Sequence, residues 1–203
     1  MIMKKILLMA AFAVATLTAN AQFYIGGSLG FNSSSDKYNA APTEITTSAI
    51  TIAPEVGYTL NEKWGIGLAF DVAFNNNKRE TAGTSVENNS TTIGVKPYAR
   101  YQALQWGKAN IFVDGGINFG MTSRKDWKSS MDLGVFVTPG IAYQISDCIS
   151  IVGKINNLFA FGFHKDDVPD VAGTPDAPTR INANLAASGF NVGALSFGVF
   201  YTF

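Results

Sequence analysis

The feature that most constrains the fold is the pattern of the last nine residues, 195–203. Leu, Phe, Val, Tyr and Phe occupy the odd positions of this segment, and Ser, Gly, Phe and Thr occupy the even positions. A period of two with one apolar face predicts a β-strand. In water, such a strand at the end of a chain would expose an edge that promotes aggregation. In a membrane, a β-sheet must close on itself, and a terminal strand of this kind can close it.

The start of the chain predicts secretion. Two lysines precede an apolar run over residues 6–17, and the motif Ala-Asn-Ala at 19–21 has the small side chains that signal peptidase needs. The run is too short to span a bilayer, so we expect a signal peptide over residues 1–21 and one barrel domain over 22–203. An uncleaved anchor helix is the alternative. No later apolar stretch approaches the ~18 residues of a transmembrane helix, so membrane insertion would have to use strands.

Seven further segments alternate in the same way as the terminal one. The eight together cover residues 23–31, 50–60, 64–74, 91–102, 109–120, 133–143, 149–155 and 195–203. Short turns alternate with long polar stretches, which cover residues 32–48, 75–90, 121–131 and 163–188. Outer-membrane barrels show this asymmetry, with short turns in the periplasm and long loops outside the cell. We therefore predict an all-β fold, an eight-stranded antiparallel up-and-down transmembrane β-barrel. Where the alternation slips, at Asn156 and Asn157, we expect a bulge or an early strand end.

A five-residue pattern, Pro-x-x-x-Tyr, supports the number of strands. It recurs at residues 54–58, 97–101 and 139–143, once in every second predicted strand. Repetition at equal depth predicts one hairpin per unit and an aromatic belt near the periplasmic ends of the strands. The predicted belt residues are Tyr58, Trp64, Tyr101 and Tyr143. Because proline cannot donate a ladder hydrogen bond, Pro54, Pro97 and Pro139 predict β-bulges within the strands.

The two faces of the strands differ in a way that identifies the interior. One face carries mainly Phe, Ile, Leu, Val and Tyr, whereas the other carries glycine, small polar residues and charge. Charge that faces lipid is costly, so the charged face should line the lumen. The predicted lumen charges are Glu55, Asp71, Lys96, Arg100, Asp114 and Lys154. The tight turn after the fourth strand places Arg100 opposite Asp114, and Asp71 should lie close to both Lys96 and Glu55. We expect one balanced, static plug; a salt-bridge gate across a narrow water path is the alternative.

With these features the chain resembles the small outer-membrane β-barrel family, also described as porin-family or outer membrane protein β-barrel domain. That family is similar in architecture to outer membrane proteins A and X. The resemblance rests on the signal sequence, the strand at 23–31 and the terminal Phe-Gly-Val-Phe-Tyr-Thr-Phe at 197–203. It implies that Tyr201 and Phe203 form the signal read by the barrel-assembly machinery. It also implies residence in the outer membrane of a Gram-negative cell, in contact with lipid and lipopolysaccharide.

His164 is the only residue that suggests a catalytic site. A Ser-His-acid hydrolase needs a serine within hydrogen-bond reach and a carboxylate behind the imidazole. Ser129, Ser130 and Ser188 are candidates because they lie on the same predicted rim. We interpret His164 as a surface histidine and expect no enzyme activity, no metal and no cofactor, since the sequence has neither Cys/His metal spacing nor a phosphate-binding loop. An acidic cluster could bind calcium weakly, although a solvated loop is the simpler interpretation; it comprises Asp166, Asp167, Asp170 and Asp176.

Three functions are compatible with these patterns. The first is a non-enzymatic barrel with a filled lumen, whose extracellular loops serve surface interaction or membrane integrity. The second is a narrow gated channel or porin for small solutes, and the third is a lipid A-modifying enzyme that depends on His164. Eight strands leave an interior filled by side chains, which favours the first function. We expect a monomer with an unidentified extracellular ligand and no nucleic-acid partner, because no basic block is present.

Overall fold

A computed structural model describes residues 22–38, 43–81, 84–125, 127–156, 158–165, 179–185 and 195–203. The predicted signal peptide lies outside these ranges. Ten strands make up most of the described chain: β1 (Phe23–Tyr38), β2 (Thr43–Thr59), β3 (Trp64–Thr81), β4 (Thr84–Trp106), β5 (Ala109–Arg124), β6 (Ser130–Gln144), β7 (Ile149–Ile155), β8 (Phe159–Lys165), β9 (Thr179–Leu185) and β10 (Leu195–Thr202). Within the described ranges, no helix has the length and apolar character that crossing a membrane requires.

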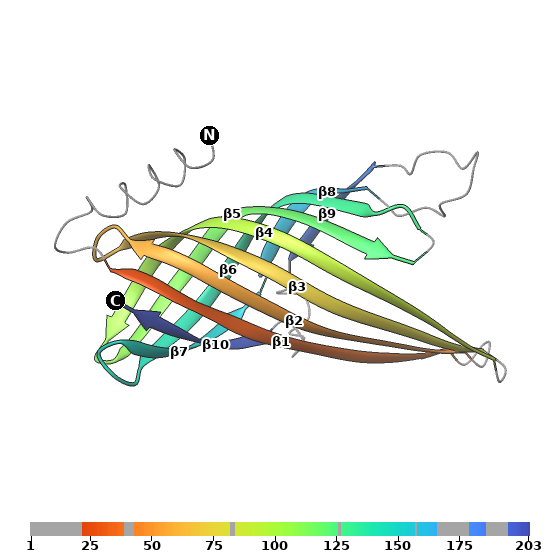
Figure 1. Cartoon of the computed structure of the whole chain (residues 1–203), viewed down its shortest axis with the longest axis horizontal. Coiled ribbons are helices and arrows are strands. Elements are labelled where there is room, and N and C mark those ends of the chain that lie inside the picture. Colours follow the sequence, from red (N-terminus) through yellow and green to blue (C-terminus); the bar gives the residue numbers. More distant parts are fainter. Residues whose placement is uncertain are drawn as a thin grey trace, which may run out of the picture.

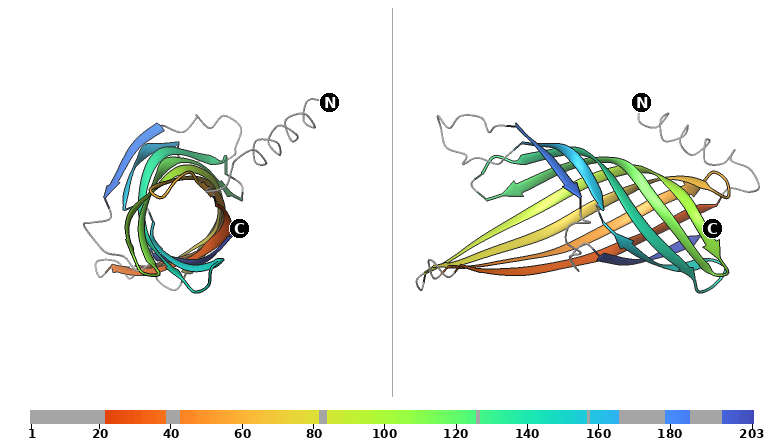
Figure 2. Two further views of the ribbon diagram at one scale, coloured as in Figure 1. Left: turned by 90° about the vertical axis from the view of Figure 1, so that its left-hand side faces the viewer. Right: turned by 180° about the vertical axis from the view of Figure 1, so that it is seen from behind.

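The strands form one antiparallel sheet that closes into a ring (Figure 1; Figure 2, left). β1 to β6 pair in chain order, and β10 pairs with both β1 and β7. β7 and β8 follow one another along β6, and β9 pairs with β8. β7 with β8 therefore fills one place in the ring, and β9 with β10 fills another. The ten strands thus occupy eight places, which confirms the predicted antiparallel up-and-down topology.

The break between β7 and β8 lies where the sequence pattern slips. Along β6, β7 stops at the pair Gly140↔Lys154 and β8 starts at the pair Val137↔Phe159. Two residues of β6 therefore separate these pairs, whereas the partner chain advances from Lys154 to Phe159. The predicted irregularity around Asn156 is confirmed, and it is an interruption of the strand.

Burial alternates along the strands as predicted. In β1, Ile25 and Leu29 are 46% and 61% exposed, whereas Tyr24 and Ser28 beside them are buried. Large aliphatic and aromatic side chains cover the outer surface of the ring, and mainly small, polar or charged side chains face inward together with a few buried aromatic residues. This is the arrangement of a wall with lipid outside and a polar interior.

Two of the predicted long loops are β-structure, which corrects the sequence analysis. β1 and β2 stay paired through residues 32–38 and 43–49, and β3 and β4 stay paired through 75–81 and 84–90. Polar side chains cover both faces here, so the apolar alternation ends while the backbone ladder continues. Cross-strand hydrogen bonds of 2.8 Å, including Asn76–Asn89, add to the ladder.

The other two predicted loops are also shorter than expected. β5 and β6 enter the stretch 121–131 from both sides, with Thr122 paired to Ser130. The stretch 163–188 contains the end of β8 and all of β9. We call the end of the ring that carries these longer connections the hairpin end. The opposite end, with the tight turns at 60–63, 107–108 and 145–148, is the short-turn end (Figure 1).

The prolines do not create the predicted bulges at Pro54 and Pro97. The β2–β3 register is the same on both sides of Pro54, and the β4–β5 register is the same on both sides of Pro97. Each of the three prolines pairs with the preceding strand and, among the described pairs, has no partner on the following one. At Pro54 and at Pro97 the sheet therefore loses two consecutive ladder positions but keeps its register. Only Pro139 coincides with an irregularity, the break between β7 and β8.

A bulge lies instead at Ala103 in β4. The β4–β5 register shifts between Gln102 and Leu104. The ladder skips the extra residue, so Leu104 and Trp106 face the outer surface, where they are 57% and 82% exposed. Gly107 then closes the hairpin with a φ of 58°, a conformation that glycine adopts without strain.

Candidate functional site in the lumen

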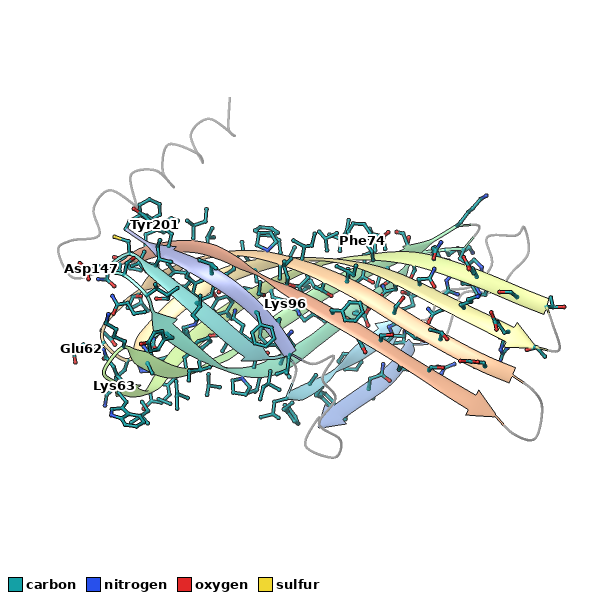
Figure 3. All side chains as sticks on the ribbon, turned by 90° about the horizontal axis from the view of Figure 1, so that it is seen from below. Glu62, Lys63, Phe74, Lys96, Asp147 and Tyr201 are labelled. Atoms are coloured by element: carbon teal, nitrogen blue, oxygen red, sulfur yellow. The ribbon has the colours of Figure 1, made fainter. Side chains whose placement is uncertain are left out.

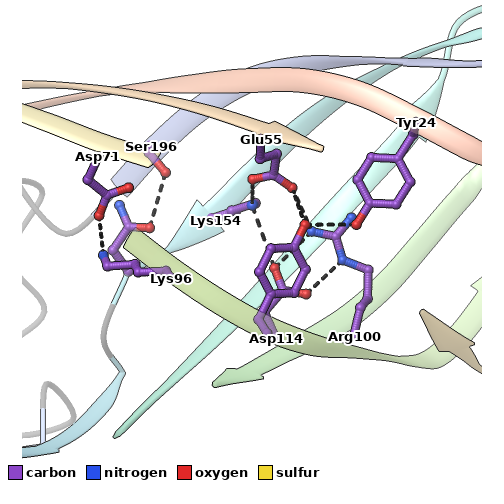
Figure 4. Close-up of polar contacts among 10 residues, drawn as sticks. Tyr24, Glu55, Asp71, Lys96, Arg100, Asp114, Lys154 and Ser196 are labelled. Carbon is purple, nitrogen blue, oxygen red and sulfur yellow. Dashed lines mark hydrogen bonds and ion pairs between the residues drawn. The ribbon is translucent and has the colours of Figure 1, made fainter. Parts of the chain in front are cut away.

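Four charged side chains meet inside the ring, and we call them the charge ring (Figure 4). They are Glu55 of β2, Arg100 of β4, Asp114 of β5 and Lys154 of β7. All four are buried, with 7% exposure or less. The alternation of each strand directs these residues inward, and closure of the sheet brings the four strands together around them.

Arg100 holds both carboxylates of the charge ring. Its Nε and Nη2 donate to the two carboxylate oxygens of Asp114 at 2.7 and 2.8 Å, and Nη2 also donates to Glu55 Oε1 at 3.1 Å. Lys154 Nζ donates to Glu55 Oε2 and lies 3.5 Å from Asp114 Oδ2. The two cations and the two carboxylates therefore form a cyclic network of ion pairs whose charges sum to zero. The predicted pairing of Arg100 with Asp114 is confirmed.

Four rings surround the guanidinium of Arg100, and we call them the aromatic collar. They are Tyr24, Tyr98, Phe112 and Phe200, with centroids 5.2, 5.3, 4.0 and 5.1 Å from Arg100 Cζ. Tyr98 donates its hydroxyl hydrogen to Glu55 Oε1 at 2.8 Å, and the two tyrosine hydroxyls lie 2.8 Å apart. Cation–π attraction is stronger when the cation is shielded from water, as it is here.

Glycines on neighbouring strands make room for the collar. A Cβ on Gly57 would lie 2.2 Å from the Tyr24 ring, and a Cβ on Gly67 would lie 2.3 Å from the Tyr98 ring. Neither ring could hold its position if these glycines carried side chains. The small residues of β2 and β3 thus determine where the large rings lie.

The chemistry of this site favours a structural role over a catalytic one. Both carboxylates already accept hydrogen bonds from cations, and the rings exclude water from the guanidinium. Removing one partner of such a buried pair leaves an uncompensated charge and costs about 3–5 kcal/mol. The charge ring and the collar therefore depend on each other.

The other two predicted lumen charges form a separate pair. Lys96 Nζ bonds to Asp71 Oδ2 as predicted, and it lies 5.6 Å from the centroid of the Phe136 ring. Glu55 does not join Asp71, because two cations, Arg100 and Lys154, draw its carboxylate into the charge ring. The expected single plug of six residues is therefore two groups.

His164 is partly exposed and belongs to a strand, β8, rather than to a loop. It is on the inward face of β8, and its Nδ1 lies 2.6 Å from Asp132 Oδ1 on β6. Of the candidate serines, Ser130 is buried and Ser129 hydrogen-bonds to Ser123. Ser188 and the acidic cluster at 166–176 lie outside the described residues. Within the described ranges, no three His, Cys, Asp or Glu side chains gather as a metal site would require.

The predicted belt residues lie at the short-turn end. Trp64 and Tyr101 are register partners whose ring centroids are 5.0 Å apart. Tyr58 pairs with Ile66, and Tyr143 pairs with Ala109 and is half exposed. Figure 3 shows Glu62, Lys63 and Asp147 at this end, with Phe74 farther along the barrel axis toward the hairpin end.

The predicted assembly residues lie at the same end of the ring. The Tyr201 and Phe203 rings are 4.9 Å apart, and the Phe203 amide donates to the Phe23 carbonyl at 2.9 Å. Tyr201 lies near Asp147 in Figure 3. The roles of these residues in membrane anchoring and assembly stay predictions.

The sequence analysis missed the aromatic collar and Asp132. Their positions in the strands could have identified them. All five residues fall on the inward face of their strands, and four of them are large aromatic residues among glycines. An inward aromatic residue flanked by glycines on adjacent strands is the pattern that would have identified the collar.

Known proteins share this architecture. The family model for the outer membrane protein beta-barrel domain matches residues 6–203. The outer membrane protein OprG from Pseudomonas aeruginosa is similar in structure, with a TM-score of 0.53 and 13% identity over 91% of this chain and 96% of that chain. Neisserial surface protein A matches with a TM-score of 0.44 and 14% identity over 91% and 100% of the two chains. Ail, the attachment invasion locus protein of Yersinia pestis, matches with a TM-score of 0.42 and 10% identity over 92% and 100%.

No curated protein sequence matches the chain significantly. At 13% identity, the likeness to OprG shows the fold alone. The family model, in contrast, covers nearly the whole sequence. The chain therefore belongs to the outer membrane protein beta-barrel domain family.

Proposed function

We propose that the protein is a non-enzymatic outer-membrane barrel with a closed lumen, which acts at the cell surface through its two long hairpins. The buried charge ring inside the aromatic collar carries this proposal. From the short-turn end, a polar cavity of about 200 Å³ reaches as far as Arg100, Tyr24, Phe112 and Phe200. These residues belong to the charge ring and the aromatic collar, and their close packing supports a lumen that is closed at that level.

The proposal includes an orientation. The signal peptide at 1–21 directs secretion, the barrel-assembly machinery reads Tyr201 and Phe203, and the short-turn end faces the periplasm. Lipid and lipopolysaccharide then surround the apolar wall of a monomer. The β1–β2 and β3–β4 hairpins project beyond the apolar wall on the outside of the cell, where they contact an extracellular ligand or support membrane integrity.

The test of the closed lumen is charge reversal combined with conductance. Arg100→Glu places a third carboxylate beside Glu55 and Asp114, so we expect a loss of roughly 3–5 kcal/mol in the free energy of unfolding. Arg100→Glu with Asp114→Arg exchanges the two signs and should restore much of the loss. Urea unfolding in lipid vesicles measures the stability, and planar-bilayer recording of the same proteins measures conductance. Arg79→Glu, at an exposed position in β3, is the matched control.

A closed lumen predicts little current from the wild type and from both variants. A gated channel predicts larger current from Arg100→Glu and a return to low current in the double variant. Steady current from the wild-type barrel would overturn the proposal directly.

A further inference from the structure

A recess lies in the inner wall of the barrel on the hairpin side of the charge ring. Its centre is a row of four register partners, Asn118, Gly134, Gly162 and Asn182, which belong to β5, β6, β8 and β9. The two glycines leave the middle of the row without side chains, and an asparagine stands on each side. These residues line a cavity of about 140 Å³, which we call the glycine recess.

The rows above and below complete the glycine recess. Toward the hairpin end lies Asp132, whose Oδ1 contacts His164 at 2.6 Å. Asp132 Oδ2 accepts no hydrogen bond from the part of the chain that the structure describes, and it lies on the Gly120 side. Toward the charge ring lie Phe136 and Ala160.

The two glycines are required by the backbone at this point. A Cβ on Gly134 would lie 2.7 Å from the Phe161 carbonyl oxygen, and a Cβ on Gly162 would lie 2.4 Å from the Leu133 carbonyl oxygen. Contacts this short with backbone atoms cannot be relieved by a side-chain rotation. The recess is therefore a built part of the wall between β6 and β8.

The size and polarity of the recess define a ligand class. A cavity of about 150 Å³ holds one six-membered ring such as benzene. The lining here is mixed: Leu133, Val135, Phe136, Ala160, Phe161 and Phe163 supply apolar atoms, and Asn118, Asn182 and Asp132 supply the polar groups. The two asparagine amides can each donate and accept hydrogen bonds, and Asp132 Oδ2 can accept one. Adjacent strands lie about 4.8 Å apart, so roughly 14 Å separates the backbones of Asn118 and Asn182, and both amides can reach a ring between them.

Charge and shape narrow the class further. Asp71 is paired with Lys96, and Asp132 lies in one row with His164 and Arg180, so the surroundings offer no excess of either sign. Phe136 and the bare glycine backbone give apolar contacts on the remaining sides. We propose that the glycine recess binds one neutral pyranose sugar ring, free or at the end of a glycan, with Asn118, Asn182 and Asp132 as its hydrogen-bonding groups.

This site goes beyond the proposed surface function. The glycine recess lies on the hairpin side of the charge ring, so a sugar bound there stays on that side and does not cross the membrane. Binding is therefore independent of conductance, and the two proposals can fail separately.

The test is sugar titration of the refolded barrel in a detergent without a sugar headgroup. The probes are glucose, galactose, mannose and N-acetylglucosamine, followed by the core oligosaccharide released from lipopolysaccharide. Saturation-transfer NMR detects binding and calorimetry measures the Kd. Binding of the monosaccharides points to a free sugar, whereas binding of the oligosaccharide alone points to a glycan end.

Two variants test whether the sugar binds in the glycine recess, and a third is the control. Ala160→Trp fills the recess and Asn118→Leu removes one amide, and each should weaken binding at least tenfold. Asn76→Leu removes an asparagine on the outer face of β3 and should bind as the wild type does. Heat-modified migration in gels verifies folding; if Ala160→Trp does not fold, Asn118→Leu with its control decides. Absence of binding to the wild type, or wild-type binding by Asn118→Leu, overturns the inference.

Discussion

At the scale of single residues, packing in the lumen depends on large side chains that each lie against a glycine on a neighbouring strand. Arg100 can stay charged in the interior because Asp114 binds it through two hydrogen bonds and four rings surround it. Those rings in turn need bare backbone on the neighbouring strands. The glycines beside the collar are thus as necessary to the ion pairs as the charged residues themselves.

Gly57→Ala tests this dependence. The added methyl group would lie 2.2 Å from the Tyr24 ring, so we expect a loss of about 1–3 kcal/mol in the free energy of unfolding. Gly30→Ala is the matched control, because its Cβ would meet no atom closer than 3.7 Å. Urea unfolding in vesicles measures both variants. Equal effects from the two substitutions would contradict the packing argument.

His164→Ala tests the enzyme alternative. His164 and Asp132 form a dyad, but Ser129 is hydrogen-bonded to Ser123 and Ser130 is buried. An acyl-transfer site needs a serine within hydrogen-bond reach of the imidazole, and the two candidate serines among the described residues are engaged or buried elsewhere. We expect mass spectrometry of lipid A from cells carrying His164→Ala to match that from wild-type cells. An altered acylation pattern would restore the enzyme hypothesis.

The ion pairs were predictable, and the collar was not. A tight turn determines which residues face each other, so Arg100 and Asp114 could be paired from the sequence. Asp71 and Lys96 could be paired because both fall on the inward face of neighbouring strands and carry opposite charges. The inward position of Tyr98 was also visible, but its partners come from β1, β5 and β10, and only closure of the ring brings those strands together.

At the scale of elements, the sequence predicts strands only where lipid enforces a pattern. Alternation marks the apolar wall from Trp64 to Phe74, and β3 then continues to Thr81 with polar residues on both faces. Backbone hydrogen bonds stabilise that extension. Because they do not require alternating apolar and polar side chains, the sequence pattern does not reveal them. β9 is a different case, because Ile181, Ala183 and Leu185 alternate with Arg180, Asn182 and Asn184, so the strand pattern is present there in a short stretch.

The bulge at Ala103 should be dispensable, because deletion of the extra residue leaves Leu104 and Trp106 facing outward. We expect the Ala103 deletion to change the free energy of unfolding by less than about 1 kcal/mol. Deletion of Val95 in the regular part of β4 is the control, since a one-residue slip reverses the faces of a strand. In a variant with Trp64→Phe and Trp127→Phe, brominated lipids should quench Trp106 equally with and without Ala103. Loss of quenching on deletion would show that the bulge positions Trp106.

At the scale of the whole molecule, the strand order joins both ends of the described chain at one rim. β1 pairs with β10, and Phe203 lies against Phe23 with ring centroids 5.6 Å apart. The tight turns share this rim, whereas the long hairpins project from the other. One orientation in the membrane therefore places the termini and every tight turn on the same side.

Cysteine labelling of intact cells tests that orientation. Cys148 is the single cysteine of the chain and is exposed in the turn between β6 and β7. If the short-turn end faces the periplasm, a membrane-impermeant maleimide should label Cys148 only after the outer membrane is permeabilised. In the Cys148→Ser background, Ser85→Cys places a thiol at an exposed position near the tip of the β3–β4 hairpin and should react on intact cells. Glu62→Cys in the same background should behave as Cys148 does, because Glu62 lies in a tight turn at the same rim. Labelling of Cys148 and Glu62→Cys on intact cells, with Ser85→Cys protected, would reverse the orientation and place the long hairpins in the periplasm.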